Sequence, residues 1–126
     1  MLIEYHIKVT GGNADVTSTK ESGQVAKVDK TNRLRADEEK VKFTSNDKDT
    51  VIRYRSSSPF DDPEVGPQTI LKVGKGSTRP FVVKKPGLEH HFDCGFINPA
   101  TNKFTTWGQT EGADTPADDG SGPGPG

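Results

Sequence analysis

Residues 3–10 alternate strictly between apolar and polar side chains, and this pattern restricts the fold more than any other feature of the chain. Residues 3, 5, 7 and 9 are apolar, and residues 4, 6 and 8 are polar or charged. Period two over this length predicts a half-buried strand from Leu2 to Thr10. Composition agrees, because Val, Ile and Thr account for 28 of the 126 residues and Ala, Leu and Met for only 11. Since β-branched side chains fit a pleated sheet and crowd a helix, we expect an all-β protein.

Further short strands are expected along the chain, separated by turn-forming residues. They lie at residues 24–28, 33–35, 40–43, 51–55, 69–73, 80–85, 88–97 and 104–107, and the rest of 14–29 is expected to be loop. Segment 56–68 contains three prolines, so it should cross the surface without regular structure. About eight short strands with turns between them predict an antiparallel Greek-key β-sandwich formed by residues 1–108.

Residues 109–126 differ from the rest of the chain in composition. They contain no Leu, Ile, Val or Phe, four acidic residues and no basic residue, and the last seven are nearly all glycine and proline. Such a segment lacks the side chains that build a core. We therefore expect a flexible, disordered, acidic C-terminal tail.

Charge and hydropathy exclude two classes of partner. The formal net charge is −1 for the whole chain and about +3 for residues 1–108, so binding by neutralising nucleic-acid phosphates is not expected. No apolar stretch approaches the ~20 residues of a membrane-spanning helix, so we expect no membrane span.

The first residues show no signal-peptide pattern, which predicts a cytoplasmic protein or the mature form of an exported one.

Two segments carry a resemblance to a known family. The first is RLRADEEKVKFTSN, from Arg33 to Asn46, and the second is FVVKKPGLEHHFDCG, from Phe81 to Gly95. The first resembles the strands that precede the first copper histidine of the cupredoxins, and the second resembles the approach to their copper cysteine. With the opening strand, the resemblance covers residues 1–108. It implies a cupredoxin-like sandwich in which Cys94 stands at the position of the copper cysteine.

The remaining copper ligands of the family are missing from their places. A type 1 copper site uses a cysteine, two histidines and usually a methionine. Residues 46–55 contain no histidine, and residues 95–126 contain neither histidine nor methionine. We therefore expect a non-enzymatic binding or structural module, without a cofactor, that has kept the scaffold and lost type 1 copper. Its protein or small-molecule partner is expected at loops 44–50, 56–68 and 95–103, which gather at the metal end in the family.

A second hypothesis is a metal-binding or electron-transfer protein. Its copper would be bound by Cys94 and His90, with His6 as a further ligand, since thiolate and imidazole suit copper and zinc. Adjacent strand residues face opposite sides, so only one of His90 and His91 can join Cys94. The simpler interpretation, which we favour, is a buried thiol beside a histidine that replaces a core aromatic side chain.

Basic residues recur at alternate positions of several expected strands. They are Arg33, Arg35, Lys40, Lys42, Arg53 and Arg55. If these strands are neighbours, their outer side forms a basic face for an anionic partner; otherwise the charges simply protect sheet edges from aggregation. No enzyme activity is expected, because the paired acids at 61–62 and 118–119 lie in loop and tail, where nothing fixes their separation.

Overall fold

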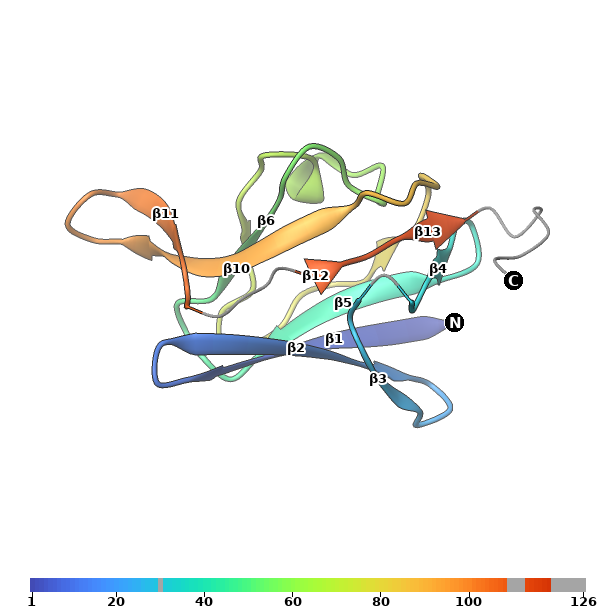
Figure 1. Cartoon of the computed structure of the whole chain (residues 1–126), viewed down its shortest axis with the longest axis horizontal. Coiled ribbons are helices and arrows are strands. Elements are labelled where there is room, and N and C mark those ends of the chain that lie inside the picture. Colours follow the sequence, from blue (N-terminus) through green and yellow to red (C-terminus); the bar gives the residue numbers. More distant parts are fainter. Residues whose placement is uncertain (30, 109–112, 119–126) are drawn as a thin grey trace.

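The regular structure of the chain is almost entirely β, as a computed structural model that describes residues 1–29, 31–108 and 113–118 shows (Figure 1). The strands are β1 (Leu2–Thr10), β2 (Asn13–Lys20), β3 (Val25–Lys27), β4 (Leu34–Arg35), β5 (Lys40–Ser45), β6 (Val51–Tyr54), β7 (Leu71–Lys72), β8 (Gly76–Ser77), β9 (Phe81–Val82), β10 (His91–Asn98), β11 (Lys103–Thr106), β12 (Ala113–Asp114) and β13 (Ala117–Asp118). A single 3-10 turn, η1 (Pro63–Val65), interrupts the described connection between β6 and β7. The prediction of an all-β protein is confirmed. Among the described residues, no helix has the length and apolar character needed to cross a membrane.

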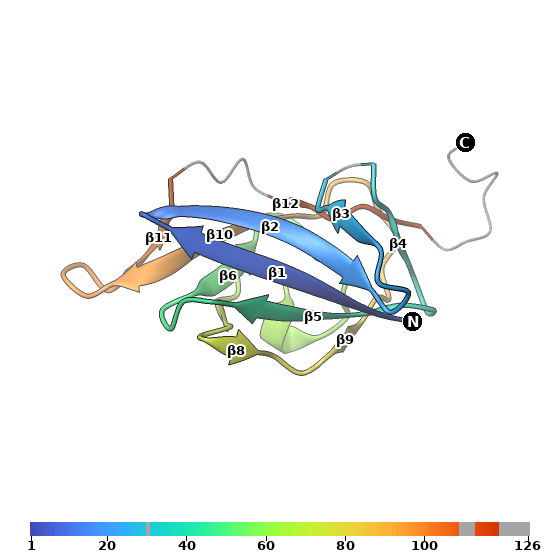
Figure 2. The same ribbon diagram turned by 90° about the horizontal axis from the view of Figure 1, so that it is seen from below.

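The first sheet has the strand order β3-β2-β1-β5-β8, with β9 also paired to β5 (Figure 2). Strand β1 runs antiparallel to β2 but parallel to β5, with Tyr5 opposite Phe43. This sheet is therefore mixed, and the prediction of a wholly antiparallel fold is wrong for it. The parallel neighbour of β1 has to come from a distant part of the chain, because a tight turn can only join antiparallel strands.

Strand β2 replaces the loop that was expected over most of residues 14–29. It follows β1 through a two-residue turn, in which Gly11 has φ of 57° and Gly12 has φ of 83°. Positive φ at both central residues is the requirement of the tight hairpin turns that match strand twist, and glycine meets it without strain. The turn thus forces the polar segment after it to pair with β1.

The second sheet has the order β11-β10-β6-β7, and β12 also pairs with β10. All its described pairings are antiparallel, with Cys94 of β10 opposite Ile52 of β6. In Figure 1 this sheet lies above the first one, so the two form the layers of a sandwich. A separate parallel pair, β4 with β13, lies at one end.

Aromatic side chains from both sheets fill the space between them. Tyr5 of β1 stacks on Phe92 of β10 with ring centroids 6.2 Å apart, and Phe43 of β5 meets Phe92 edge-on at 5.6 Å. Tyr54, Phe60 and Phe81 are also at most 1% exposed. Edge-on and stacked aromatic pairs each contribute about 0.5–1.5 kcal/mol beyond simple burial. This cluster joins the two layers.

Residues 113–118 belong to the sandwich, so the expectation of disorder from residue 109 onward is wrong for this segment. Ala113, Thr115 and Ala117 are at most 2% exposed. The Thr115 amide donates to the His90 carbonyl oxygen at 2.6 Å, and the Gly87 amide donates to that of Ala117 at 2.8 Å. Backbone hydrogen bonds and small buried side chains fix residues 113–118 to the rest of the domain. A count of large apolar residues does not detect such contacts. The rest of the expected tail, 109–112 and 119–126, lies outside the described residues.

Candidate functional site

Cys94 lies in the hydrophobic core and has no exposed surface. Its position on β10 directs it inward between the two sheets, opposite Ile52. Burial raises the pKa of the thiol far above its usual value, and the negative charge of Asp93 raises it further. Since the thiolate is the form that attacks electrophiles and binds metals, this environment makes the sulfur unreactive.

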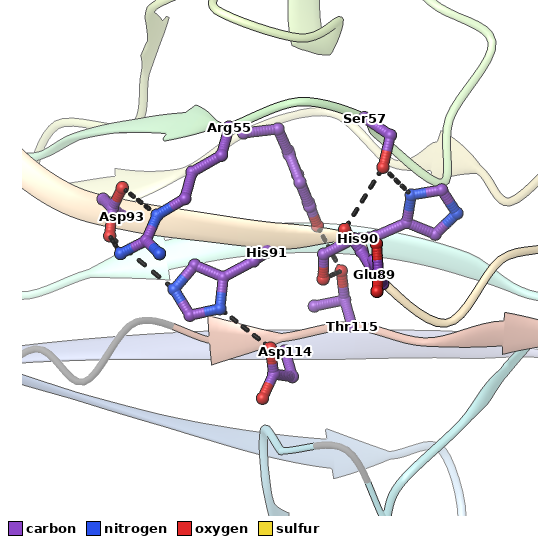
Figure 3. A network of polar contacts seen from close by, with 9 residues as sticks. Arg55, Ser57, Glu89, His90, His91, Asp93, Asp114 and Thr115 are labelled. Atoms are coloured by element: carbon purple, nitrogen blue, oxygen red, sulfur yellow. Dashed lines mark hydrogen bonds and ion pairs between the residues drawn. The ribbon is translucent and has the colours of Figure 1, made fainter.

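His90 is buried just before β10 and is fixed through both ring nitrogens. Nε2 lies 3.1 Å from the carbonyl oxygen of Lys85, and Nδ1 lies 2.8 Å from the Ser57 hydroxyl (Figure 3). Burial lowers the pKa of His90, so the neutral imidazole is favoured. A carbonyl can only accept, so Nε2 carries the proton and Nδ1 accepts from Ser57. The residue therefore makes specific polar contacts and is more than a stand-in for an aromatic side chain.

His6 lies apart from these two residues, on the outer side of β1. Its ring nitrogens contact the hydroxyls of Thr44 at 2.8 Å and Thr19 at 3.1 Å, both on neighbouring strands. In the described part of the chain, no three His, Cys, Asp or Glu side chains are grouped so that they could hold a metal ion. The structure thus does not bring Cys94, His90 and His6 together as the copper hypothesis requires. The reason is that β1 turns His6 away from the core that encloses Cys94.

The other polar residues of this region form a network on the outer face of β10 (Figure 3). Asp93 receives two hydrogen bonds from Arg55, at 2.8 and 2.9 Å, in a two-point ion pair. His91 Nδ1 lies 2.8 Å from the Asp114 carboxylate, while its buried Nε2 is 3.7 Å from Asp93 and makes no hydrogen bond. The side chains of His91 and Asp93 are thus only 17% and 11% exposed. They link β6 and β10 to the segment that contains Asp114.

The six basic residues expected to form one face lie on different sheets. Arg35 is in β4, Lys40 and Lys42 are in β5, Arg53 is in β6, Arg33 precedes β4 and Arg55 follows β6. Within the described residues, three of the six form ion pairs: Arg35 with Glu38, Lys42 with Glu4, and Arg55 with Asp93. The guanidinium of Arg53 lies 4.4 Å from the centre of the Phe104 ring. The hypothesis of a single basic face is therefore wrong, because the strands concerned are not neighbours.

A groove of about 610 Å³ occupies the outer face of the second sheet. Strand β6 contributes Val51, the β7 region contributes residues 70 and 72–74, and the end of β10 with its turn contributes Ile97 and Asn102. The turn before β6, residues 48–50, closes one side. Loops 44–50 and 95–103 therefore meet here, as expected, whereas loop 56–68 leaves from the opposite end of β6.

The floor of this groove is apolar and its sides carry charge. Val51 is 4% exposed. Its neighbour Ile52 faces the core, so Val51 lies on the opposite, outer side of β6. Ile70 and Ile97 are half-buried beside it, and Lys48 and Lys72 are exposed. Cavities that bind small ligands typically measure about 300–1,000 Å³ and combine an apolar lining with a few polar groups. The volume of this groove lies in that range, and its lining combines apolar and polar residues in about equal number.

No known protein family, curated protein or solved structure matches the chain.

Proposed function

We propose that the protein is a non-enzymatic binding module, built on a cupredoxin-like β-sandwich that does not use type 1 copper. Its binding site is the groove on the outer face of the second sheet. The observation that carries this proposal is the groove itself, which is lined by the half-buried Ile70 and Ile97 and by Val51, on the side of β6 opposite the core residue Ile52. A sheet with one solvated face normally presents polar side chains on that face. Apolar side chains gathered in a hollow there favour a bound ligand.

The contacts of the chemically versatile residues support a scaffold role for them. The thiol of Cys94 is enclosed in the core, and both ring nitrogens of His90 have partners. Asp93 is held by Arg55 at two points. These groups stabilise the second sheet and its connections, so the groove rather than this cluster is the better candidate for function.

The test is to map where small probes bind. Amide ¹H–¹⁵N spectra of the full chain would be recorded with indole, p-cresol and phenylacetate. We expect the shift changes to concentrate at residues 48–51, 70–74 and 97–102. The matched control is Ile97→Asp, which places a charge on the groove floor and should reduce these changes. Changes that are scattered over the surface, or that persist in Ile97→Asp, contradict the proposal.

A further inference from the structure

The groove is bordered by two lysines, Lys48 and Lys72, that form no ion pair within the described residues. The lysine ion pairs of the described residues are Lys42 with Glu4, Lys84 with Asp37 and Lys85 with Asp61. Neither Lys48 nor Lys72 belongs to one of them, although both line the groove. Six other described lysines also lack such a pair. Lys48 and Lys72 differ from them because both border one groove, where their ammonium groups are available to a ligand.

The other polar groups of the groove do not cancel this charge. Asp49 is the single carboxylate among the residues that line it, against two lysines. The Thr50 hydroxyl is buried and lies 2.6 Å from the hydroxyl of Ser45, so it is already engaged. Asn102 adds an uncharged amide. The lining therefore combines an excess of positive charge with the apolar floor of Val51.

We propose that the groove binds an amphipathic organic anion. Its carboxylate or sulfonate head interacts with Lys48 and Lys72, and its apolar body covers Val51, Ile70 and Ile97. This inference rests on the proposed function and specifies the class of ligand. Opposite charge at the rim selects the anion, while removal of apolar surface from water supplies most of the affinity.

The position of the groove favours a compact ligand over an added β-strand. The groove extends over the face of the sheet, from residues 70 and 72–74 across Val51 to Ile97. A peptide that extends a sheet has to align with the free edge of a strand, where backbone donors and acceptors are exposed. A ligand lying on the face meets side chains instead. An acid with a small apolar body fits this arrangement.

The experiment compares two fluorescent probes that differ only in charge. 1-Anilinonaphthalene-8-sulfonate carries a sulfonate, and N-phenyl-1-naphthylamine is the same ring system without it. Both would be titrated into the full chain and into Lys48→Gln/Lys72→Gln. We expect the double variant to raise the Kd of the sulfonate probe by about two- to thirtyfold, the range for two exposed ion pairs, and to leave the neutral probe unchanged. The matched control is Lys8→Gln/Lys27→Gln, which removes two exposed lysines from the first sheet and should alter neither Kd.

A third variant separates failure of this inference from failure of the proposed function. Ile97→Asp should raise the Kd of both probes. If the urea midpoint of Ile97→Asp is lower than that of the wild type, the variant is destabilised, and Ile70→Gln is used in its place. If Lys48→Gln/Lys72→Gln raises the Kd of both probes equally, or of neither, the inferred anion preference is wrong. The groove is still supported as a binding site in that case, provided that the floor variants raise the Kd of both probes. If the floor variants change neither Kd, the probes bind elsewhere and the proposed site is wrong. Displacement of the sulfonate probe by decanoate, or by acetyl-trileucine with a free carboxylate, distinguishes a small acid from a peptide C-terminus.

Discussion

Replacing Thr115 by valine tests whether residues 113–118 are part of the folded domain. The two side chains have nearly the same shape, so the substitution removes one hydroxyl and little else. In the structure this hydroxyl is fully buried and lies 3.0 Å from both the Tyr54 hydroxyl and the His90 carbonyl oxygen. In a disordered tail it would be in water, and its loss would not affect folding.

The expected cost follows from the groups left behind. The His90 carbonyl keeps its bond from the Thr115 amide, but the buried Tyr54 hydroxyl loses the donor. Leaving a buried polar group without its partner costs about 1–3 kcal/mol. The added methyl group recovers up to ~0.8 kcal/mol by burial. We therefore expect Thr115→Val to lower the free energy of unfolding by roughly 1–2 kcal/mol.

Urea unfolding followed by the fluorescence of Trp107 measures this change. The control is Thr106→Val, which alters an exposed threonine on β11 and should stay within about 0.5 kcal/mol of the wild type. If Thr115→Val is as stable as Thr106→Val, the segment is not docked through this hydroxyl and the reasoning fails. An unchanged slope with denaturant would show that both variants expose the same surface on unfolding.

Four further predictions concern the second sheet and its surroundings. His90→Phe should destabilise by about 1–3 kcal/mol, because the Lys85 carbonyl loses its partner and the Ser57 hydroxyl keeps only the Glu89 carbonyl oxygen; a neutral effect in urea would contradict the assignment. Because the pKa of His90 is lowered in the folded state, the unfolded chain takes up the proton first, so stability should fall as the pH drops below about 6.5, and His90→Phe should lack this component of the loss. Cys94 should react with Ellman's reagent only after unfolding, and Cu(II) should give no thiolate-to-copper colour; a colour lost in Cys94→Ser would show that the core opens to metal. Gly95→Ala should destabilise by about 1–3 kcal/mol in urea, since its Cβ would lie 2.1 Å from the Thr105 carbonyl oxygen, and full stability would mean that β11 moves freely.

Strands with alternating apolar residues could be predicted from the sequence because one of their faces meets the core. The strand predicted over residues 2–10 matches β1, and that predicted over 40–43 is the first part of β5. Ile3, Tyr5, Ile7 and Phe43 on these strands are at most 2% exposed. For these strands, burial of one face is the main contribution to the free energy of folding, and it produces the alternating pattern of apolar and polar residues.

Strand β2 was not predicted because its inward side chains are small. Ala14 and Ser18 are at most 5% exposed, and Val16 is half-buried between them. Such a segment does not stand out by hydrophobicity, and its pairing with β1 is determined by the turn. Two consecutive glycines after a clear strand were the available signal, since they favour a tight hairpin. The docking of residues 113–118 had no comparable signal, because it depends on backbone bonds to distant loops.

The groove was also missed, although the sequence contains a trace of it. Three segments that become neighbours in the second sheet each contain two consecutive apolar residues: Val51-Ile52, Ile70-Leu71 and Phe96-Ile97. Successive strand residues face opposite sides, so each pair must place one apolar side chain on the face away from the core. In the structure the outward members, Val51, Ile70 and Ile97, line one hollow, while Ile52 and Leu71 join the core.

A single exposed apolar residue has little significance, because folded proteins expose many. Two half-buried isoleucines on adjoining segments of one sheet, Ile70 and Ile97, form a local apolar surface beside the buried Val51. Leaving this surface in water costs free energy that a polar substitution at either isoleucine would reduce. The two lysines at the same rim outnumber its one carboxylate, Asp49, so the rim carries a net positive charge. A ligand with an apolar body and a negative head covers the apolar surface and neutralises this charge, so the floor and the rim of the groove point to the same kind of occupant.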